Sequence, residues 1–280
     1  MAASRSVQTV LVTGANSGLG LATAIELAQR GYRVIGSVRS AEKGQRLTSA
    51  ARAAGTTIEN IVFDVADAVA SAAALEEIGP LYGLVNNAGG GGVGAIEDVT
   101  DAEARHTMEV MAIAPMRLAR LVLPAMRAAG EGRIINISSI YGRTSTPLTG
   151  WYQGAKHALE GLSDALRIEV AGAGIKVVLV EPGAFRTAIF DEASDAMAGR
   201  PGSHYEAAYR RSSTLTRLSA PFMGNPEQVA KVVATALAAR RPRDRYLVGA
   251  DAQALAAMER AVPLVPRSVI DRVTRLAMGL

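Results

Sequence analysis

Short apolar runs of strand length alternate with longer helical stretches along most of the chain. The runs lack a clean apolar/polar alternation, which is typical of strands buried on both faces of a parallel sheet. They are Thr9–Thr13, Arg33–Val38, Ile58–Phe63, Leu81–Val85, Arg133–Ile137, Lys176–Val180 and Tyr246–Val248. The stretches with helical spacing include Gly18–Gln29, Ala102–Ala129, Ala155–Val170 and Pro226–Ala239. This order predicts an α/β fold with one doubly wound parallel sheet.

We expect a single domain over residues 1–280, because neither a Pro/Ser-rich linker nor a repeat of solenoid length divides the chain. Two segments fall outside the alternation. Residues 184–225 have mixed polarity and predict a substrate lid. Residues 251–280 predict a C-terminal helical extension that packs on the domain or on a neighbouring subunit, with membrane-surface contact as the alternative.

Composition excludes several function classes. The chain has no cysteine, so disulfides and cysteine-based zinc sites are excluded, and its three histidines lack metal-ligand spacing. No apolar run reaches the roughly 18 residues of a membrane span. The first ten residues contain no apolar core of a secretory signal, so we expect a cytoplasmic protein.

The net charge of +4 raises the question of nucleic-acid binding. The basic residues are scattered, however, and a single cluster stands out between a helix-like and a strand-like run. It consists of Arg240, Arg241, Arg243 and Arg245. We interpret it as a solvated turn and expect no nucleic-acid partner.

A glycine-rich turn follows the first strand directly and precedes a helical stretch. Its spacing is G-x-x-x-G-x-G. Glycines let the backbone turn sharply and approach a pyrophosphate, and the following helix N-terminus offers N–H groups to the anion. The turn therefore predicts a dinucleotide site, to which we assign Gly14, Asn16, Ser17, Gly18, Leu19 and Gly20.

Arg39 indicates which dinucleotide binds. About 20 residues beyond the glycines, an NAD-binding fold usually places an acid against the ribose hydroxyls. Here the second strand ends without an acid and Arg39 follows it. A guanidinium can pair with a 2′-phosphate, so NADP(H) is preferred over NAD(H). The alternative is that Arg39 is an ordinary solvated loop residue.

Three side chains form a candidate catalytic set. Tyr152 and Lys156 are four residues apart at the start of a helical run, so they share one helix face. An ammonium beside a phenol stabilises the phenolate and lowers its pKa, which suits acid/base work. Ser139 follows the buried strand RIINI, at a strand end where a hydroxyl can donate to a substrate oxygen. Each feature alone also fits a surface pair or a turn.

Together these motifs resemble the short-chain dehydrogenase/reductase (SDR) family. The matches are T-G-x-x-x-G-x-G at Thr13–Gly20, N-N-A-G at Asn86–Gly89, the Ser139, Tyr152 and Lys156 triad, and P-G at Pro182–Gly183 followed by Thr187. The resemblance covers about residues 7–250. The overall pattern is also similar, less specifically, to hydroxysteroid- and retinol-dehydrogenase-like members.

The resemblance implies a Rossmann-type sheet of about seven strands with helices on both faces, and a homodimer or homotetramer. It implies that Tyr152 exchanges the proton, that Lys156 holds the nicotinamide ribose, and that Ser139 orients the substrate carbonyl. Asn86 would brace the turn near the cofactor. The further cofactor contacts that it implies are Asp64, Val65, Asn87, Ala88, Gly89, Pro182, Gly183 and Thr187.

Met111 departs from the family pattern, since it occupies the place of a catalytic Asn. Methionine cannot replace the amide hydrogen bonds. Pro115 has no N–H to bond the Met111 carbonyl within a helix, and we hypothesise that this carbonyl holds a water near Lys156. The alternative is a helix kink without catalytic meaning.

These features predict an NADP(H)-dependent oxidoreductase that moves a hydride between the nicotinamide and a medium-sized apolar ketone, aldehyde or secondary alcohol. The apolar residues of the lid favour such a substrate, although several could simply pack the lid: Phe185, Ile189, Phe190, Met197, Tyr205 and Tyr209. One alternative is a catalytically impaired NADP(H)-binding regulatory protein, which Met111 favours. Another is an NAD-linked alcohol dehydrogenase, which Arg39 disfavours.

Overall fold

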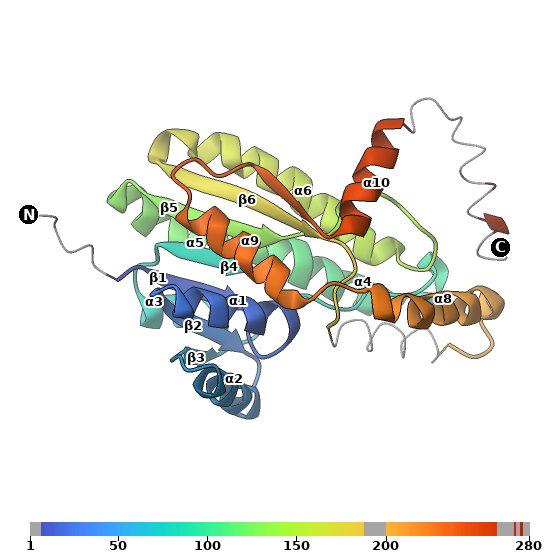
Figure 1. Ribbon diagram of the computed structural model, residues 1–280, viewed down its shortest axis with the longest axis horizontal. Coiled ribbons are helices and arrows are strands. Elements are labelled where there is room, and N and C mark those ends of the chain that lie inside the picture. Colours follow the sequence, from blue (N-terminus) through green and yellow to red (C-terminus); the bar gives the residue numbers. More distant parts are fainter. Residues whose placement is uncertain (1–6, 188–199, 262–271, 273–274, 277–280) are drawn as a thin grey trace, which may run out of the picture.

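The computed structural model describes residues 7–187, 200–261, 272 and 275–276. Seven strands form one parallel sheet with the order β3-β2-β1-β4-β5-β6-β7, and helices cover both of its faces (Figure 1). This confirms the predicted Rossmann-type α/β fold. The strands are β1 Thr9–Thr13, β2 Arg33–Val38, β3 Glu59–Val62, β4 Gly83–Asn86, β5 Gly132–Ile137, β6 Ile175–Pro182 and β7 Arg245–Val248.

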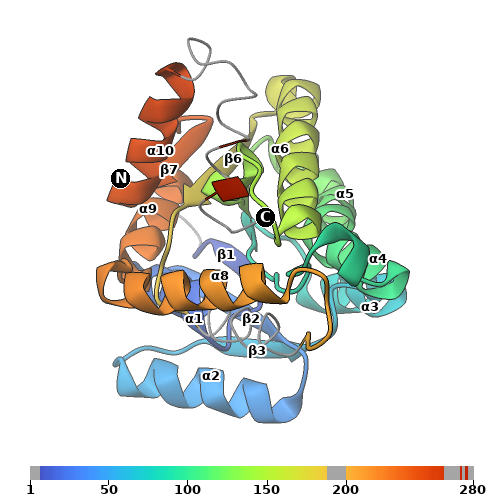
Figure 2. The same cartoon turned by 90° about the vertical axis from the view of Figure 1, so that its right-hand side faces the viewer.

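The helices form two layers. Figure 2 shows α1 and α9 on one side of the sheet and α5 and α6 on the other. The α-helices are α1 Gly18–Gln29, α2 Ala41–Ala53, α3 Ala68–Ile78, α4 Asp101–Met108, α5 Ala114–Ala129, α6 Gly150–Val170, α8 Glu206–Ser219, α9 Pro226–Ala238 and α10 Ala250–Ala261. Shorter turns are η1 Ile96–Asp98, η2 Glu109–Ile113, η3 Ile140–Gly142, η4 Ala171–Ala173 and η5 Ala220–Phe222.

The central strands are buried on both faces, which explains their unbroken apolar runs. In β1, Val10 and Val12 join the core beneath α1 and α9. Leu11, between them, joins the core beneath α3 and α5. Successive strand residues point to opposite faces, so a strand covered on both sides needs apolar residues at every position.

The strand order reverses at β1, and this reversal places the site. The chain runs outward from β1 through β2 to β3, then returns to β4 on the other side of β1. In such sheets the ligand crevice lies outside the carboxyl ends of the strands at the reversal. Thr13 ends β1 and Asn86 ends β4, so both lie at this crevice.

The helical stretch expected over Ala102–Ala129 is confirmed, but it is not one regular α-helix. A π-turn, η2, separates α4 from α5, and the Ala114 N–H bonds the Glu109 carbonyl five residues back. Pro115 follows at once in the first turn of α5. Because proline has no N–H and its ring crowds the preceding turn, Pro115 disturbs the α-helical hydrogen bonds at this point. Met111 lies inside the π-turn.

The predicted solvated turn is wrong for Arg245. This residue begins β7 and forms ion pairs with the carboxylates of Glu160, Asp164 and Glu181. Strand spacing turns its side chain toward α6, whereas composition alone assigned it to the surface with the preceding arginines.

The lid segment contains a longer helix than its mixed polarity suggested, since α8 spans Glu206–Ser219. Three of its predicted substrate-facing residues, Ile189, Phe190 and Met197, lie outside the described residues, as does most of the C-terminal extension beyond Ala261. Within the described part of the chain, no helix combines the length and apolarity needed to cross a bilayer. No group of metal-ligating side chains is found among those residues.

Candidate active site

The glycine turn between β1 and α1 leaves an open backbone cradle. Gly14 and Gly18 have φ values of 65° and 53°, which favour glycine. A Cβ at Gly20 would lie 2.3 Å from the Gly14 carbonyl oxygen. Ser17, the N-cap of α1, makes no side-chain cap, and the first turn of α1 contains no acid. The N–H groups of this helix end are therefore available to an anion.

Thr13 joins the glycine turn to the N-N-A-G motif. Its hydroxyl accepts hydrogen bonds from the backbone N–H groups of Asn87 and Ala88, both at 2.9 Å. In return, the Asn87 amide donates to the carbonyls of Thr13 and Gly14 at 2.9 and 3.3 Å. The predicted cofactor residues Asn87 and Ala88 thus lie against the cradle. Thr13 opens the quoted T-G-x-x-x-G-x-G motif but was not predicted as a site residue, although a threonine ending an aliphatic strand was a usable signal.

Asn86 braces the strand ends beneath this crevice, as expected. Its amide donates to the Asn136 side-chain oxygen at 2.8 Å and to the Pro115 carbonyl at 3.3 Å. Asn136 donates in turn to the Ser163 hydroxyl at 2.8 Å. This buried chain links β4, β5, α5 and α6 and holds the floor of the site.

Arg39 and Asp64 lie at the ends of the next two strands outward. Arg39 follows β2 and is exposed, and Ser40 beside it caps α2. Asp64 follows β3, where one carboxylate oxygen accepts from the Ala66 N–H at 2.9 Å. Val65 is buried next to it. The parallel strands carry these residues to the same edge of the sheet as Gly14.

Ser139, Tyr152 and Lys156 come together at the carboxyl end of β5. Ser139 caps η3, with its hydroxyl accepting from the Tyr141 N–H at 3.2 Å. The Ser139 hydroxyl also acts on the Tyr152 phenol, whose pKa it lowers. Lys156 Nζ lies 5.8 Å from the centroid of the Tyr152 ring and donates to the Ile137 carbonyl at 2.8 Å. Residues far apart in the sequence therefore form one polar group.

The expected lowering of the Tyr152 pKa is wrong for this structure. Burial raises the pKa of Tyr152, and the hydrogen bond from Ser139 opposes that rise only in part. Burial also lowers the pKa of Lys156 to about 8, against an opposing effect of Glu160. The spacing of Tyr152 and Lys156 reveals a neighbouring cation but not the burial of the two side chains, and desolvation acts on both groups. The phenol consequently stays protonated at neutral pH.

A glycine-rich loop supports the start of α6. The Gly92 carbonyl accepts from the Tyr152 N–H at 3.3 Å, and a Cβ at Gly92 would lie 2.8 Å from the Tyr152 nitrogen. Gly89, a predicted cofactor residue, lies against Met111, whose sulfur would be 3.5 Å from a Cβ there. Met111 is thus a buried packing neighbour of the N-N-A-G turn. That its carbonyl holds a water stays a prediction.

The end of β6 brings the P-G motif and Thr187 to the cradle. Thr187 packs against Gly18, whose Cβ would lie 3.1 Å from the threonine methyl. Pro182 ends β6, and Gly183 is confined by Asp251, whose carboxylate would lie 2.2 Å from a Cβ there. Asp251 also accepts from the Ala184 N–H at 2.5 Å. Asp251 was missed because an acid in the C-terminal segment carries no motif.

The described part of the lid is fastened to the loop before α4. The Tyr209 hydroxyl donates to Asp98 at 2.7 Å and accepts from the Ala95 N–H at 2.7 Å. Ser203 donates to the same carboxylate at 2.6 Å. Phe185 and Tyr209 are both buried, so they pack the lid. His204 contacts Tyr205 edge to face.

A cavity of about 1220 Å³ opens beside the cradle. It runs from Gly18 and Thr187 along α1 to η5 and the start of α9. The side chains of the triad do not belong to the described residues that line it. The cavity therefore adjoins the glycine turn at Gly18.

Comparison with known proteins agrees with this geometry. The family model described as short chain dehydrogenase matches residues 8–198. The uncharacterized oxidoreductase YbbO of Escherichia coli (strain K12) is 34% identical over 270 residues, covering 95% of this chain and 93% of that protein.

Two solved structures are similar over most of the chain. A short-chain dehydrogenase from Streptomyces avermitilis has a TM-score of 0.78 and 35% identity, covering 97% of this chain and 98% of that one. A variant of actinorhodin polyketide ketoreductase with NADPH has a TM-score of 0.76 and 30% identity, covering 88% and 97%. The chain therefore belongs to the short-chain dehydrogenase family of oxidoreductases.

Proposed function

We propose that the protein is an NADP(H)-dependent oxidoreductase acting on a medium-sized apolar ketone, aldehyde or secondary alcohol, with Tyr152 as acid/base. The observation that carries this proposal is the meeting of three groups. The Ser139 hydroxyl lowers the pKa of the Tyr152 phenol, and the Lys156 ammonium lies over the phenol ring. A purely binding protein has no need of such a buried acid/base set.

The cradle fits a dinucleotide phosphate. Backbone without side chains at Gly14 and Gly18, and the uncapped N-terminus of α1, would hold the pyrophosphate. Arg39 would pair with a 2′-phosphate, and Thr187 would contact the nicotinamide side. The similar ketoreductase with NADPH supports this preference. When bound, NADP(H) supplies or accepts the hydride.

The chain's own groups handle the proton. In reduction, Tyr152 gives its phenolic proton to the carbonyl oxygen, and in oxidation it takes the proton back. Its raised pKa keeps that proton in place at neutral pH. Lys156 stabilises the phenolate that forms, and Ser139 turns its hydroxyl toward the substrate oxygen as negative charge develops.

The segment around α8 would cover the substrate, held by the contacts of Tyr209 and Ser203 with Asp98. Such a cover excludes water and favours an apolar substrate. The proposal extends to a homodimer or homotetramer working in the cytoplasm, as the family resemblance and composition indicate.

The test is NADPH oxidation by the full chain with a panel of apolar ketones and aldehydes. Tyr152→Phe should lower kcat by roughly 10²–10⁴-fold while leaving NADPH binding measurable. Tyr32→Phe, which removes a hydroxyl from the stacked Tyr32–Tyr82 pair remote from the site, is the matched control and should keep wild-type rates. NADPH binding without turnover of any substrate would instead indicate the regulatory protein.

A further inference from the structure

A line of ionisable residues continues along α6 beyond the active site. Tyr152, Lys156, Glu160 and Asp164 follow one another at intervals of four, so they lie along one side of the helix. Lys156 and Glu160 are both buried. Burying a carboxylate one helical turn from a buried ammonium costs desolvation free energy unless the two charges stabilise each other.

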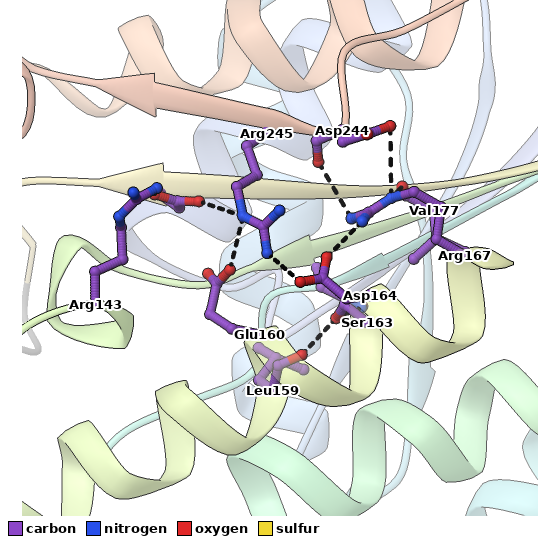
Figure 3. Close-up of polar contacts among 11 residues, drawn as sticks. Arg143, Leu159, Glu160, Ser163, Asp164, Arg167, Val177, Asp244 and Arg245 are labelled. Atoms are coloured by element: carbon purple, nitrogen blue, oxygen red, sulfur yellow. Dashed lines mark hydrogen bonds and ion pairs between the residues drawn. The ribbon is translucent and has the colours of Figure 1, made fainter. Parts of the chain in front are cut away.

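The two carboxylate oxygens of Glu160 differ in their surroundings. Its Oε2 lies 3.2 Å from Arg245 Nε, and Figure 3 shows Arg245 reaching from β7 to Glu160 and Asp164. Its Oε1 is buried without a hydrogen-bond partner among the described residues. That oxygen would lie 3.3 Å from a Cβ at Gly142, in the turn that Ser139 caps. The open side of the carboxylate thus adjoins the active-site turn.

Arg245 is shared among three carboxylates. Besides Glu160, it contacts Asp164 at 2.5 Å and Glu181 at 3.2 Å. Glu181 is fully buried and also pairs with Arg143 at 3.3 Å. Because one guanidinium contacts several acids, its charge is divided among them and offsets each only in part.

We propose that Glu160 is a positioning residue for the reaction: its carboxylate keeps the Lys156 ammonium charged, and Arg245 limits how strongly it does so. This inference rests on the proposed function, in which Lys156 stabilises the Tyr152 phenolate. A neutral Lys156 would leave the Tyr152 phenolate without its cation.

The electrostatic balance at Lys156 agrees with this geometry. Burial lowers the pKa of Lys156 to about 8, and Glu160 is the opposing influence. Without the Glu160 charge, the pKa of Lys156 falls further and the ammonium is lost at a lower pH. Among the described residues, the titratable and charged groups around this pair include Tyr152 on α6 and Arg245 on β7. Glu181 in β6 acts on Glu160, and Arg143 after η3 pairs with Glu181.

The experiment is the pH profile of kcat for carbonyl reduction in Glu160→Gln, which keeps the shape of the side chain. Its alkaline limb should move to lower pH by roughly one unit. Asp164→Asn, on the same helix and the same arginine, leaves the Glu160 carboxylate in place and should move the limb much less than Glu160→Gln does. Glu160→Asp should restore much of the wild-type profile. A Glu160→Gln profile that superimposes on the wild-type one would overturn the inference.

Arg245→Gln should shift the alkaline limb in the opposite direction. It also provides a second test if Glu160→Gln does not fold. Removing the arginine increases the negative potential at Lys156, so the limb should move to higher pH. The pKa of Lys156 itself can be followed by NMR of isotope-labelled lysine in the cofactor-free protein. An unchanged lysine pKa in both variants refutes the inference even if the enzyme proves inactive, whereas a fully active Tyr152→Phe refutes the proposed function alone.

Discussion

Gly20 lies so close to Gly14 that a Cβ at Gly20 would be 2.3 Å from the Gly14 carbonyl oxygen. The same Cβ would be 2.4 Å from the amide nitrogen of Asn87. Gly20→Ala must therefore push the turn open, and we expect it to lower the free energy of unfolding by about 1–3 kcal/mol and to abolish NADPH binding. Urea denaturation and fluorescence titration measure the two effects.

Gly161→Ala is the control for that substitution. Gly161 lies inside α6 with no heavy atom within 4 Å of an added Cβ. Alanine should stabilise the protein there by about 0.4–1 kcal/mol, because it restricts the unfolded chain. Equal effects of the two substitutions would mean that helix propensity, and not the close approach, governs Gly20.

Thr13 supplies a second test of the cradle. Its hydroxyl accepts hydrogen bonds from the N–H groups of Asn87 and Ala88. Thr13→Val keeps the shape and leaves both donors unpaired, so it should lower the free energy of unfolding by about 1–3 kcal/mol. Thr13→Ser keeps the oxygen and should lose much less. Chemical denaturation of the two variants measures both effects. A Thr13→Val variant as stable as wild type would show that the hydroxyl does not stabilise this turn.

The sheet could be predicted from the sequence because its strands are buried on both faces. The limits of β1, β2 and α1 agree with the expected ranges. Gly14 directly follows β1 and Gly31 lies between α1 and β2, so glycines mark these limits in the sequence. The π-turn at Met111 could not be predicted, because Pro115 equally permits a simple kink.

The candidate site was predictable where a motif carries the chemistry, as at Gly14, Ser139 and Tyr152. The site was not predictable where its residues are brought together by tertiary packing. The contact of Arg245 with Glu160 joins residues 85 positions apart, and nothing local distinguishes Arg245 from its solvated neighbours. The direction of the Tyr152 pKa shift likewise depends on burial, which spacing does not reveal.

Lys156 should make stability depend on pH in a definite direction. Its pKa falls from 10.5 to about 8 on folding, so between these values the unfolded chain holds a proton that the folded one lacks. Stability therefore rises with pH across that window. The free energy of unfolding of wild type minus that of Lys156→Met should grow by roughly 3 kcal/mol between pH 8 and pH 10.5. Urea denaturation of the cofactor-free proteins at both pH values measures it, and a flat or falling difference would contradict a depressed lysine pKa.

Arg39 should decide between the two dinucleotides. It is exposed at the end of β2, next to the N-cap of α2, where a 2′-phosphate would approach. Arg39→Asp replaces a cation with an anion, so it should raise the KM for NADPH by roughly 10–100-fold through repulsion and lost pairing. The KM for NADH should fall, because a carboxylate there can accept from the ribose hydroxyls. Arg46→Asp, in an exposed ion pair with Glu42 on α2, is the matched charge control and should leave the ratio of kcat/KM for the two cofactors unchanged. If Arg39→Asp still prefers NADPH as strongly as wild type, the 2′-phosphate is recognised by other groups.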